Sequence, residues 1–194
     1  MDIVELQRIY AKHPHVKGVA AQLENSSVRT IFMGGLHASA SPLFFSALVR
    51  NTSRTYVFIL GDVEEAGYFY HDLVQINGDE SILFFPSSYR RAIKYGQKDP
   101  ANEILRTEVL SRLQKHEPLC IVTYPDALAE MVVSGKELAD RTVSLQVGQR
   151  IETEALMETL YHAGFEQVDY VYEPGQYALR GSILDVYSFA SEFP

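Results

Sequence analysis

One turn in the sequence has the setting of a phosphate-binding loop. Gly34-Gly35 follows an apolar run that predicts a strand over residues 30–33, and a helix is predicted over residues 42–49. A working P-loop also needs a second glycine, a lysine for the β- and γ-phosphates and a hydroxyl for Mg²⁺. In this register those three positions are held by Ala40, Ser41 and Pro42. The sequence therefore predicts a turn without phosphate chemistry and without a bound nucleotide.

Other residue types that catalyse reactions or bind metals do not form a recognisable set. His13 and His15 are the one close histidine pair, and no carboxylate cluster completes a metal site. No serine lies in a G-x-S-x-G nucleophile motif; the loop serines weighed as nucleophiles are Ser39, Ser41, Ser87 and Ser88. Cys120 lies inside an apolar run, which favours a buried thiol. We expect no catalytic residue, no metal and no cofactor in this chain.

Charge argues against broad contact with nucleic acid. The 194 residues carry 17 Lys and Arg against 25 Asp and Glu, a net charge of -8, so no extended positive field exists to attract phosphates. One basic, aromatic segment runs from Tyr89 through Arg90 and Arg91 to Lys98. It predicts a surface loop, and we expect little or no direct DNA binding.

Two further features bear on the compartment. A single cysteine excludes a disulfide within the chain, which is typical of a reducing environment. The N-terminus has no apolar signal segment, and no stretch approaches the roughly 20 apolar residues of a membrane span. The expected location is the cytoplasm, away from membranes.

Strands and helices alternate in the first two thirds of the chain. A helix is strongly predicted after Asp99-Pro100, since aspartate caps helices and proline suits the first turn. Repeated alternation predicts an α/β domain over residues 1–134, with a parallel sheet covered by helices. Its strands are predicted at residues 30–33, 56–60, 82–85 and 119–123.

The pattern changes near Ser134-Gly135. Residues 135–194 contain four Lys or Arg against ten Asp or Glu, and they predict a smaller α+β domain. Its helix is expected at residues 153–162, and its strands at residues 142–147, 168–172, 177–180 and 183–187. Arg180 stands out because the rest of this domain is so acidic.

The segment 173–187 predicts a β-hairpin. Simple alternation from Arg180 onward puts Arg180, Ser182 and Leu184 on one face, and it puts Ile183, Asp185 and Tyr187 on the other. An arginine beside an apolar side chain is typical of protein-protein hot spots, whereas the plainer alternative is a solvated arginine packed along the sheet. The residues alone leave both interpretations open.

Several blocks together carry a resemblance to a known family. The most specific block is Glu173-Pro174-Gly175-Gln176-Tyr177-Ala178-Leu179-Arg180-Gly181-Ser182-Ile183-Leu184-Asp185-Val186-Tyr187; the others are Gly35–Ala40, Phe84–Tyr89, Arg106–Leu113, Ile121–Thr123, Val147-Gly148 and Gly164–Asp169. In this order they resemble the N-terminus of the bacterial transcription-repair coupling factor (Mfd). The last block is shared with the excision-repair subunit UvrB.

The resemblance implies a non-catalytic copy of UvrB: a degenerate, helicase-like α/β domain with a small α+β domain that docks on UvrA. It implies partner-binding positions at Arg180, Leu184, Tyr177 and Gln167. Gln167 departs from the pattern, because UvrB-like sequences commonly have arginine there. In the family, the full-length protein is an ATP-dependent DNA translocase, so motor domains beyond this fragment are expected to hold ATP and Mg²⁺ and to reach DNA, with a separate domain for RNA polymerase.

Two other functions stay open at this point. The strand-turn-helix frame around Gly34-Gly35 is compatible with a nucleotide hydrolase that has an atypical phosphate loop, although the missing lysine argues against this function. The basic segment keeps alive a DNA-binding accessory domain. The leading hypothesis is a module that recruits UvrA in transcription-coupled nucleotide excision repair.

Overall fold

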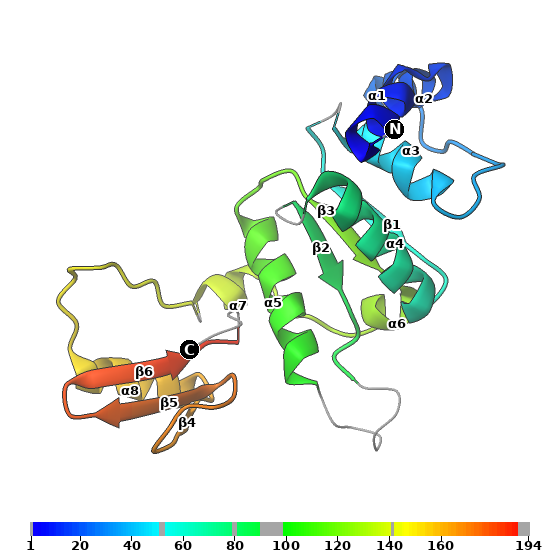
Figure 1. Cartoon of the computed structure of the whole chain (residues 1–194). Helices are drawn as coiled ribbons and strands as arrows, with labels where there is room; N and C mark the ends of the chain where they lie inside the picture. Colours follow the sequence, from blue (N-terminus) through cyan, green and yellow to red (C-terminus); the bar gives the residue numbers. More distant parts are fainter. Residues whose placement is uncertain (1, 51–52, 79–80, 90–98, 141, 190–194) are drawn as a thin grey trace. The chain divides into compact units, whose positions relative to one another are not determined.

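The computed structural model describes residues 2–50, 53–78, 81–89, 99–140 and 142–189 (Figure 1). The chain forms two compact units: Met1–Pro86 with His116–Ala129, and Ser87–Lys115 with Glu130–Pro194. The boundary between residues 134 and 135 expected from the sequence stays a prediction.

Three helices open the first unit: α1 (Ile3–Lys12), α2 (Pro14–Glu24) and α3 (Ala40–Val49). The α1 helix begins where the Asp2 carboxylate accepts a hydrogen bond from the Glu5 N–H, at 2.7 Å. These helices bury a small core of Val16, Phe44, Ala47 and Leu48. The helix predicted over residues 42–49 is confirmed.

A parallel sheet forms the rest of this unit. Its strands are β1 (Tyr56–Ile59), β2 (Ile82–Phe85) and β3 (Cys120–Thr123), in the order β1-β3-β2. The α4 helix (Val63–Asn77) contacts β2 and β3, and the short α6 (Pro125–Leu128) follows β3. All four residues of the central strand are buried, which explains its continuous apolar run. The parallel sheet and the mixed helix-and-strand class are confirmed.

The strand predicted at residues 30–33 is wrong: the structure assigns no strand there. Met33 and Leu36 pack instead against the core of α2 and α3, and Phe32 is 94% exposed. The apolar side chains of this segment therefore find their partners among helices rather than in the sheet. A helicase-like sheet extended by this strand is not confirmed.

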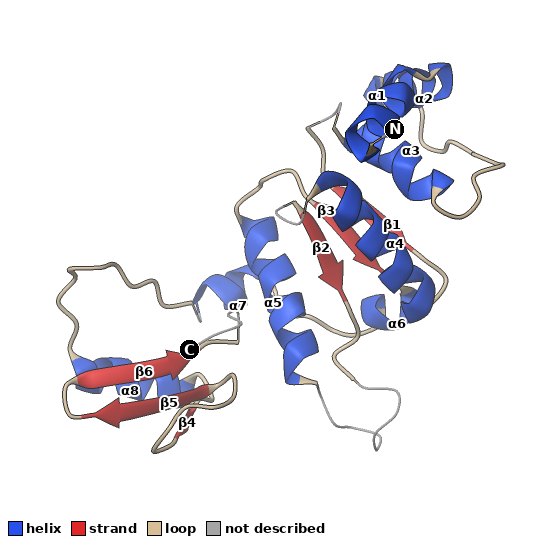
Figure 2. Ribbon diagram, viewed as in Figure 1, coloured by secondary structure: helices blue, strands red, loops and turns tan. Residues whose placement is uncertain are grey.

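Within its described residues, the second unit has three helices and a small mixed sheet. Figure 2 shows these helices and strands. The helices are α5 (Pro100–Gln114), α7 (Gly135–Asp140) and α8 (Thr153–His162); the strands are β4 (Glu166–Gln167), β5 (Gln176–Arg180) and β6 (Ile183–Tyr187). Asp99 caps α5 by accepting a hydrogen bond from the Ala101 N–H at 3.1 Å, as its sequence predicts. The sequence did not predict α7.

Two predicted strands of this unit are wrong. Residues 142–147 form none, and the alternating side chains of Val143, Leu145 and Val147 are exposed. Alternation alone does not make a strand where no neighbour pairs with it. The strand predicted at residues 168–172 lies earlier and is shorter, because pairing with β5 runs only over Glu166 and Gln167.

Among the described residues, no helix is long and apolar enough to cross a bilayer.

Candidate functional site

The hairpin β5–β6 contains the two longest strands described in the second unit. Its strands pair antiparallel, with Tyr177 opposite Val186 and Arg180 opposite Ile183. A two-residue loop, Gly181-Ser182, joins them, and Gly181 takes a φ of +65°. Glycine is preferred at the first position of such tight loops because it tolerates a positive φ.

One face of the hairpin belongs to the hydrophobic core. Tyr177 is only 3% exposed and packs with Leu156 and Leu160 of α8, and Leu184 and Val186 pack against the same cluster. This arrangement places Leu184 and Tyr177 on the covered face. Figure 1 shows α8 lying along this small sheet.

The expected alternation from Arg180 to Leu184 is therefore wrong. Arg180 is opposite Ile183, whereas Leu184 is opposite Leu179, and side chains directly opposite each other share a face. Arg180, Ile183 and Asp185 thus lie together on the face opposite that of Leu184. Ala178 on the same face is fully buried, so we call only the exposed end of this face, next to the Gly181-Ser182 loop, the open face. The loop at Gly181-Ser182 breaks the count, because the two strands are not one continuous strand.

Two side chains hold the guanidinium of Arg180. Asp185 accepts hydrogen bonds through Oδ2 from Nε, at 3.1 Å, and from Nη2. The ring of Tyr170 lies beneath the guanidinium, with its centroid 5.5 Å from Cζ. The side chain of Arg180 is still 51% exposed and that of Asp185 is 32% exposed. The result is a cation that two side chains contact and that solvent and a partner can reach.

The four predicted partner-binding residues do not share one surface. Gln167 is exposed on β4 and pairs in register with Tyr177, three residues along β5 from Arg180. Tyr177 is buried, and Leu184 is partly buried on the covered face. Their binding roles stay predictions. Sequence reasoning missed Tyr170, and it put Ile183 and Asp185 on the face opposite Arg180; the tight turn at Gly181-Ser182 was the available clue.

The turn before α3 uses some of its hydrogen-bond donors within the protein. The N–H of Ala40 donates to the His37 carbonyl at 3.1 Å, and the N–H of Ser41 donates to the Ala38 carbonyl at 3.2 Å. Pro42 has no N–H. The hydroxyl of Ser39 donates to the Asp72 carboxylate at 3.0 Å. Two backbone donors and one hydroxyl donor of this turn are thus already used within the protein.

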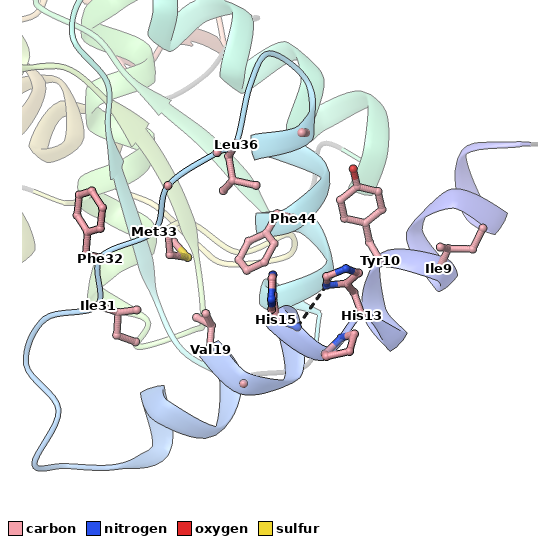
Figure 3. A pocket seen from close by; sticks show the side chains of 15 residues that line it. Ile9, Tyr10, His13, His15, Val19, Ile31, Phe32, Met33, Leu36 and Phe44 are labelled. Atoms are coloured by element: carbon pink, nitrogen blue, oxygen red, sulfur yellow. Dashed lines mark hydrogen bonds between the residues drawn. The ribbon is translucent and has the colours of Figure 1, made fainter.

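A cavity of about 750 Å³ lies beside this turn (Figure 3). The side chains of Met33, Phe44 and His15 point toward one another in it, whereas Phe32 points away. No lysine, arginine or carboxylate is among the described residues that line it. His13 and His15 also line the cavity. His13 caps α2 by accepting a hydrogen bond from the His15 N–H at 3.2 Å. The cavity is mostly apolar and, apart from the two histidines, none of its described lining residues has a side chain that binds phosphate or a metal.

A second charged cluster is buried in the second unit. The Glu130 carboxylate accepts hydrogen bonds from the hydroxyls of Ser87 and Ser88. It also accepts from the Ser88 N–H, whose nitrogen lies 3.0 Å from Oε1 and 3.1 Å from Oε2. Nη2 of Arg106 lies 3.5 Å from Glu130 Oε2, and their side chains are 8% and 16% exposed. The two loop serines thus serve a carboxylate and are not poised as nucleophiles.

The surroundings of two groups change their pKa values. Burial opposes ionisation of Glu130, but the hydrogen bonds from Ser87 and Ser88 and the charge of Arg106 outweigh it and lower the pKa of this carboxyl. Burial raises the pKa of the Cys120 thiol to about 11. Cys120 is therefore a protonated, buried side chain, as expected from its apolar run.

Two expectations concern residues beyond these sites. The basic segment from Arg90 to Lys98 lies outside the described residues. Across the described part of the chain, no three His, Cys, Asp or Glu side chains gather closely enough to hold a metal ion. The absence of a metal or cofactor stays a prediction.

Comparison with known proteins adds to this geometry. Residues 143–194 match the family model of the UvrB interaction domain, and this segment contains α8 and the hairpin. The transcription-repair-coupling factor of Bacillus subtilis is 29% identical over 162 residues, which is 84% of this chain and 14% of that protein. The coupling factor of Escherichia coli is 24% identical over 164 residues, with the same shares.

This chain resembles the UvrB-like N-terminal region of transcription-repair-coupling factors. The UvrABC system protein B of Levilactobacillus brevis is also similar, at 23% identity over 79% of this chain and 25% of that protein. The match to both kinds of protein supports the DNA-repair and UvrB-like assignment made from the sequence. The chain spans 14% of the length of the two coupling factors.

Proposed function

We propose that this chain is a protein-interaction module that docks UvrA through the hairpin β5–β6 and so serves transcription-coupled nucleotide excision repair. The match of residues 143–194 to the UvrB interaction domain carries this proposal. In the proposed role the chain has no catalytic step of its own. ATP-driven translocation on DNA and contact with RNA polymerase belong, in the same proposal, to other parts of a full-length coupling factor.

The chemistry of the hairpin supports a docking role. Arg180 is exposed on the open face, and the exposed side chains of Ile183 and Tyr170 lie near it in the structure. Arginine and tyrosine are enriched among residues that dominate binding energy. The covered face contributes to binding only indirectly, because Leu184 packs against the core cluster that holds the hairpin on α8.

Binding of the whole chain to purified UvrA tests the proposal. Arg180→Ala should weaken binding at least about tenfold, since truncating a hot-spot arginine typically costs ~2 kcal/mol or more. The thermal melt should not change much, because an exposed ion pair contributes only about 0–1 kcal/mol. Leu184→Ala should weaken binding less and should lower the melting temperature, because its side chain packs on the core.

Arg54→Ala is the matched control. Arg54 is also an exposed arginine in one surface ion pair, with Glu24 at 3.4 Å, but it lies in the first unit. Its loss should leave UvrA affinity unchanged. The proposal fails if wild-type chain does not bind UvrA, or if Arg180→Ala and Arg54→Ala bind like wild type.

A further inference from the structure

The Arg180 guanidinium is held on only one of its edges. Asp185 Oδ2 accepts from Nε and Nη2, and these donors form one side of the planar group. Its Cζ atom lies over the Tyr170 ring, 5.5 Å from the ring centroid. Among the described residues, none accepts a hydrogen bond from Nη1. The end of the guanidinium formed by Nη1 and the second hydrogen of Nη2 is therefore free.

That free end has a definite chemical preference. Two parallel N–H groups of an arginine match two oxygens of a carboxylate or a phosphate in a strong bidentate pair, and on a protein partner that group is a carboxylate. Exposed apolar and aromatic surface near it comes from Ile183, at 59% exposure, and Tyr170, also at 59%. The open face thus fits a partner surface that has a carboxylate beside an apolar or aromatic contact.

We propose that Asp185 and Tyr170 are positioning residues that fix Arg180 so that its free end meets a carboxylate on the docking surface of UvrA. This inference rests on the proposed function. Asp185 holds the guanidinium in the free protein and stays bound to it in the complex, while the partner's carboxylate takes the opposite end. In the complex, the Arg180 guanidinium then lies between the Asp185 carboxylate and the partner's carboxylate, next to the Tyr170 ring.

The expected gain is the ordering of a flexible side chain before binding. An arginine loses rotamer freedom when an interface immobilises it, and a side chain that is already ordered avoids much of that loss. Removing the ordering should therefore weaken binding about three- to tenfold. The alternative is that Asp185 masks Arg180 and competes with the partner, in which case its removal would strengthen binding.

The test compares Asp185→Asn, Asp185→Glu and Tyr170→Ala with wild type in UvrA binding and in thermal melts. Asp185→Asn and Tyr170→Ala should each weaken binding about three- to tenfold with melts near that of wild type. Asp185→Glu should recover part of the loss, because it restores the carboxylate. In an Arg180→Ala background, neither substitution should weaken binding further, since the residue that they position is gone. Glu24→Gln, which removes the equivalent partner of Arg54, is the matched control and should have no effect.

Order of the guanidinium is measured separately on the free protein. The Nε–H resonance of Arg180 should exchange slowly with solvent in wild type and faster in Asp185→Asn. Stronger or unchanged UvrA binding by Asp185→Asn overturns the positioning role even if Arg180→Ala weakens binding as proposed. Loss of binding by Asp185→Asn that persists in the Arg180→Ala background also overturns it. Failure of wild type to bind UvrA, by contrast, refutes the proposed function and the positioning role together.

Discussion

The second unit contains two arginine–carboxylate pairs in opposite surroundings. The pair of Arg106 and Glu130 is nearly buried, and two serines add hydrogen bonds to the carboxylate. The pair of Arg180 and Asp185 is exposed, and one end of the guanidinium has no acceptor among the described residues. Among the described residues no buried side-chain nitrogen or oxygen lacks a hydrogen-bond partner, so the first pair offers no free donor to another molecule. The second keeps donors available to another molecule.

The comparison separates stability from recognition. A buried ion pair is costly to break, because removing one partner leaves the other charge out of water. An exposed pair adds little stability, since water screens it and competes for both groups. Substitution at Glu130 should therefore change the free energy of unfolding, and substitution at Arg180 should change binding.

The largest effect is expected from Glu130→Ala. The substitution removes the acceptor of three donors from Ser87 and Ser88 and leaves the buried Arg106 without this carboxylate. The free energy of unfolding should fall by about 3 kcal/mol or more. Denaturant unfolding of the whole chain measures this, provided that the second unit is followed by a local probe.

Glu24→Ala serves as the comparison for that experiment. Glu24 pairs with Arg54, but their side chains are 66% and 49% exposed, so the loss should stay within about 0.5 kcal/mol. Equal destabilisation by Glu130→Ala and Glu24→Ala would contradict the distinction between the two kinds of ion pair.

A smaller effect is expected on lowering the pH. The folded protein holds the pKa of Glu130 below its ordinary value of 4.5, so the ionised carboxylate contributes stability above about pH 4.5. That contribution should be lost as the pH falls through the lowered pKa, because the folded state then has to take up the proton. Stability measured from pH 6 to pH 3 should drop less steeply in Glu130→Gln than in wild type. Parallel pH profiles for the two proteins would show that Glu130 does not contribute.

Much of the fold could be predicted from local patterns. The α5 helix follows from Asp99-Pro100 and its apolar spacing, and the central strand β3 follows from an unbroken apolar run. Local patterns did not show that residues 30–33 and 142–147 form no strand. Whether an apolar segment becomes a strand depends on a neighbour that pairs with it, and that neighbour is set by the tertiary structure.

The candidate site shows the same limit at the level of side chains. The sequence indicates Arg180 as an unusual cation in an acidic region, and it indicates a hairpin around it. Which residues share its face depends on the register set by the loop at Gly181-Ser182, because a shift of one residue moves every side chain to the other face. Tyr170 lies ten residues before Arg180 in a loop, and no periodic pattern relates the two. The cluster around Glu130 is equally non-local, since Ser87 and Ser88 precede it by more than 40 residues.

The smallest effect, no effect at all, is expected when ATP and Mg²⁺ are added. In the turn before α3 some donors are already used, because the N–H groups of Ala40 and Ser41 are bonded to the carbonyls of His37 and Ala38. No lysine stands at the position that would contact the β- and γ-phosphates. A ligand present at about 100 times its Kd would stabilise the protein by about 2.7 kcal/mol and raise its melting temperature by several degrees, so an unchanged melt in millimolar ATP excludes micromolar binding. A saturable rise that disappears in Ser41→Asp, which puts a carboxylate at the start of α3, would instead show that this turn still binds phosphate and that its internal hydrogen bonds give way to a ligand.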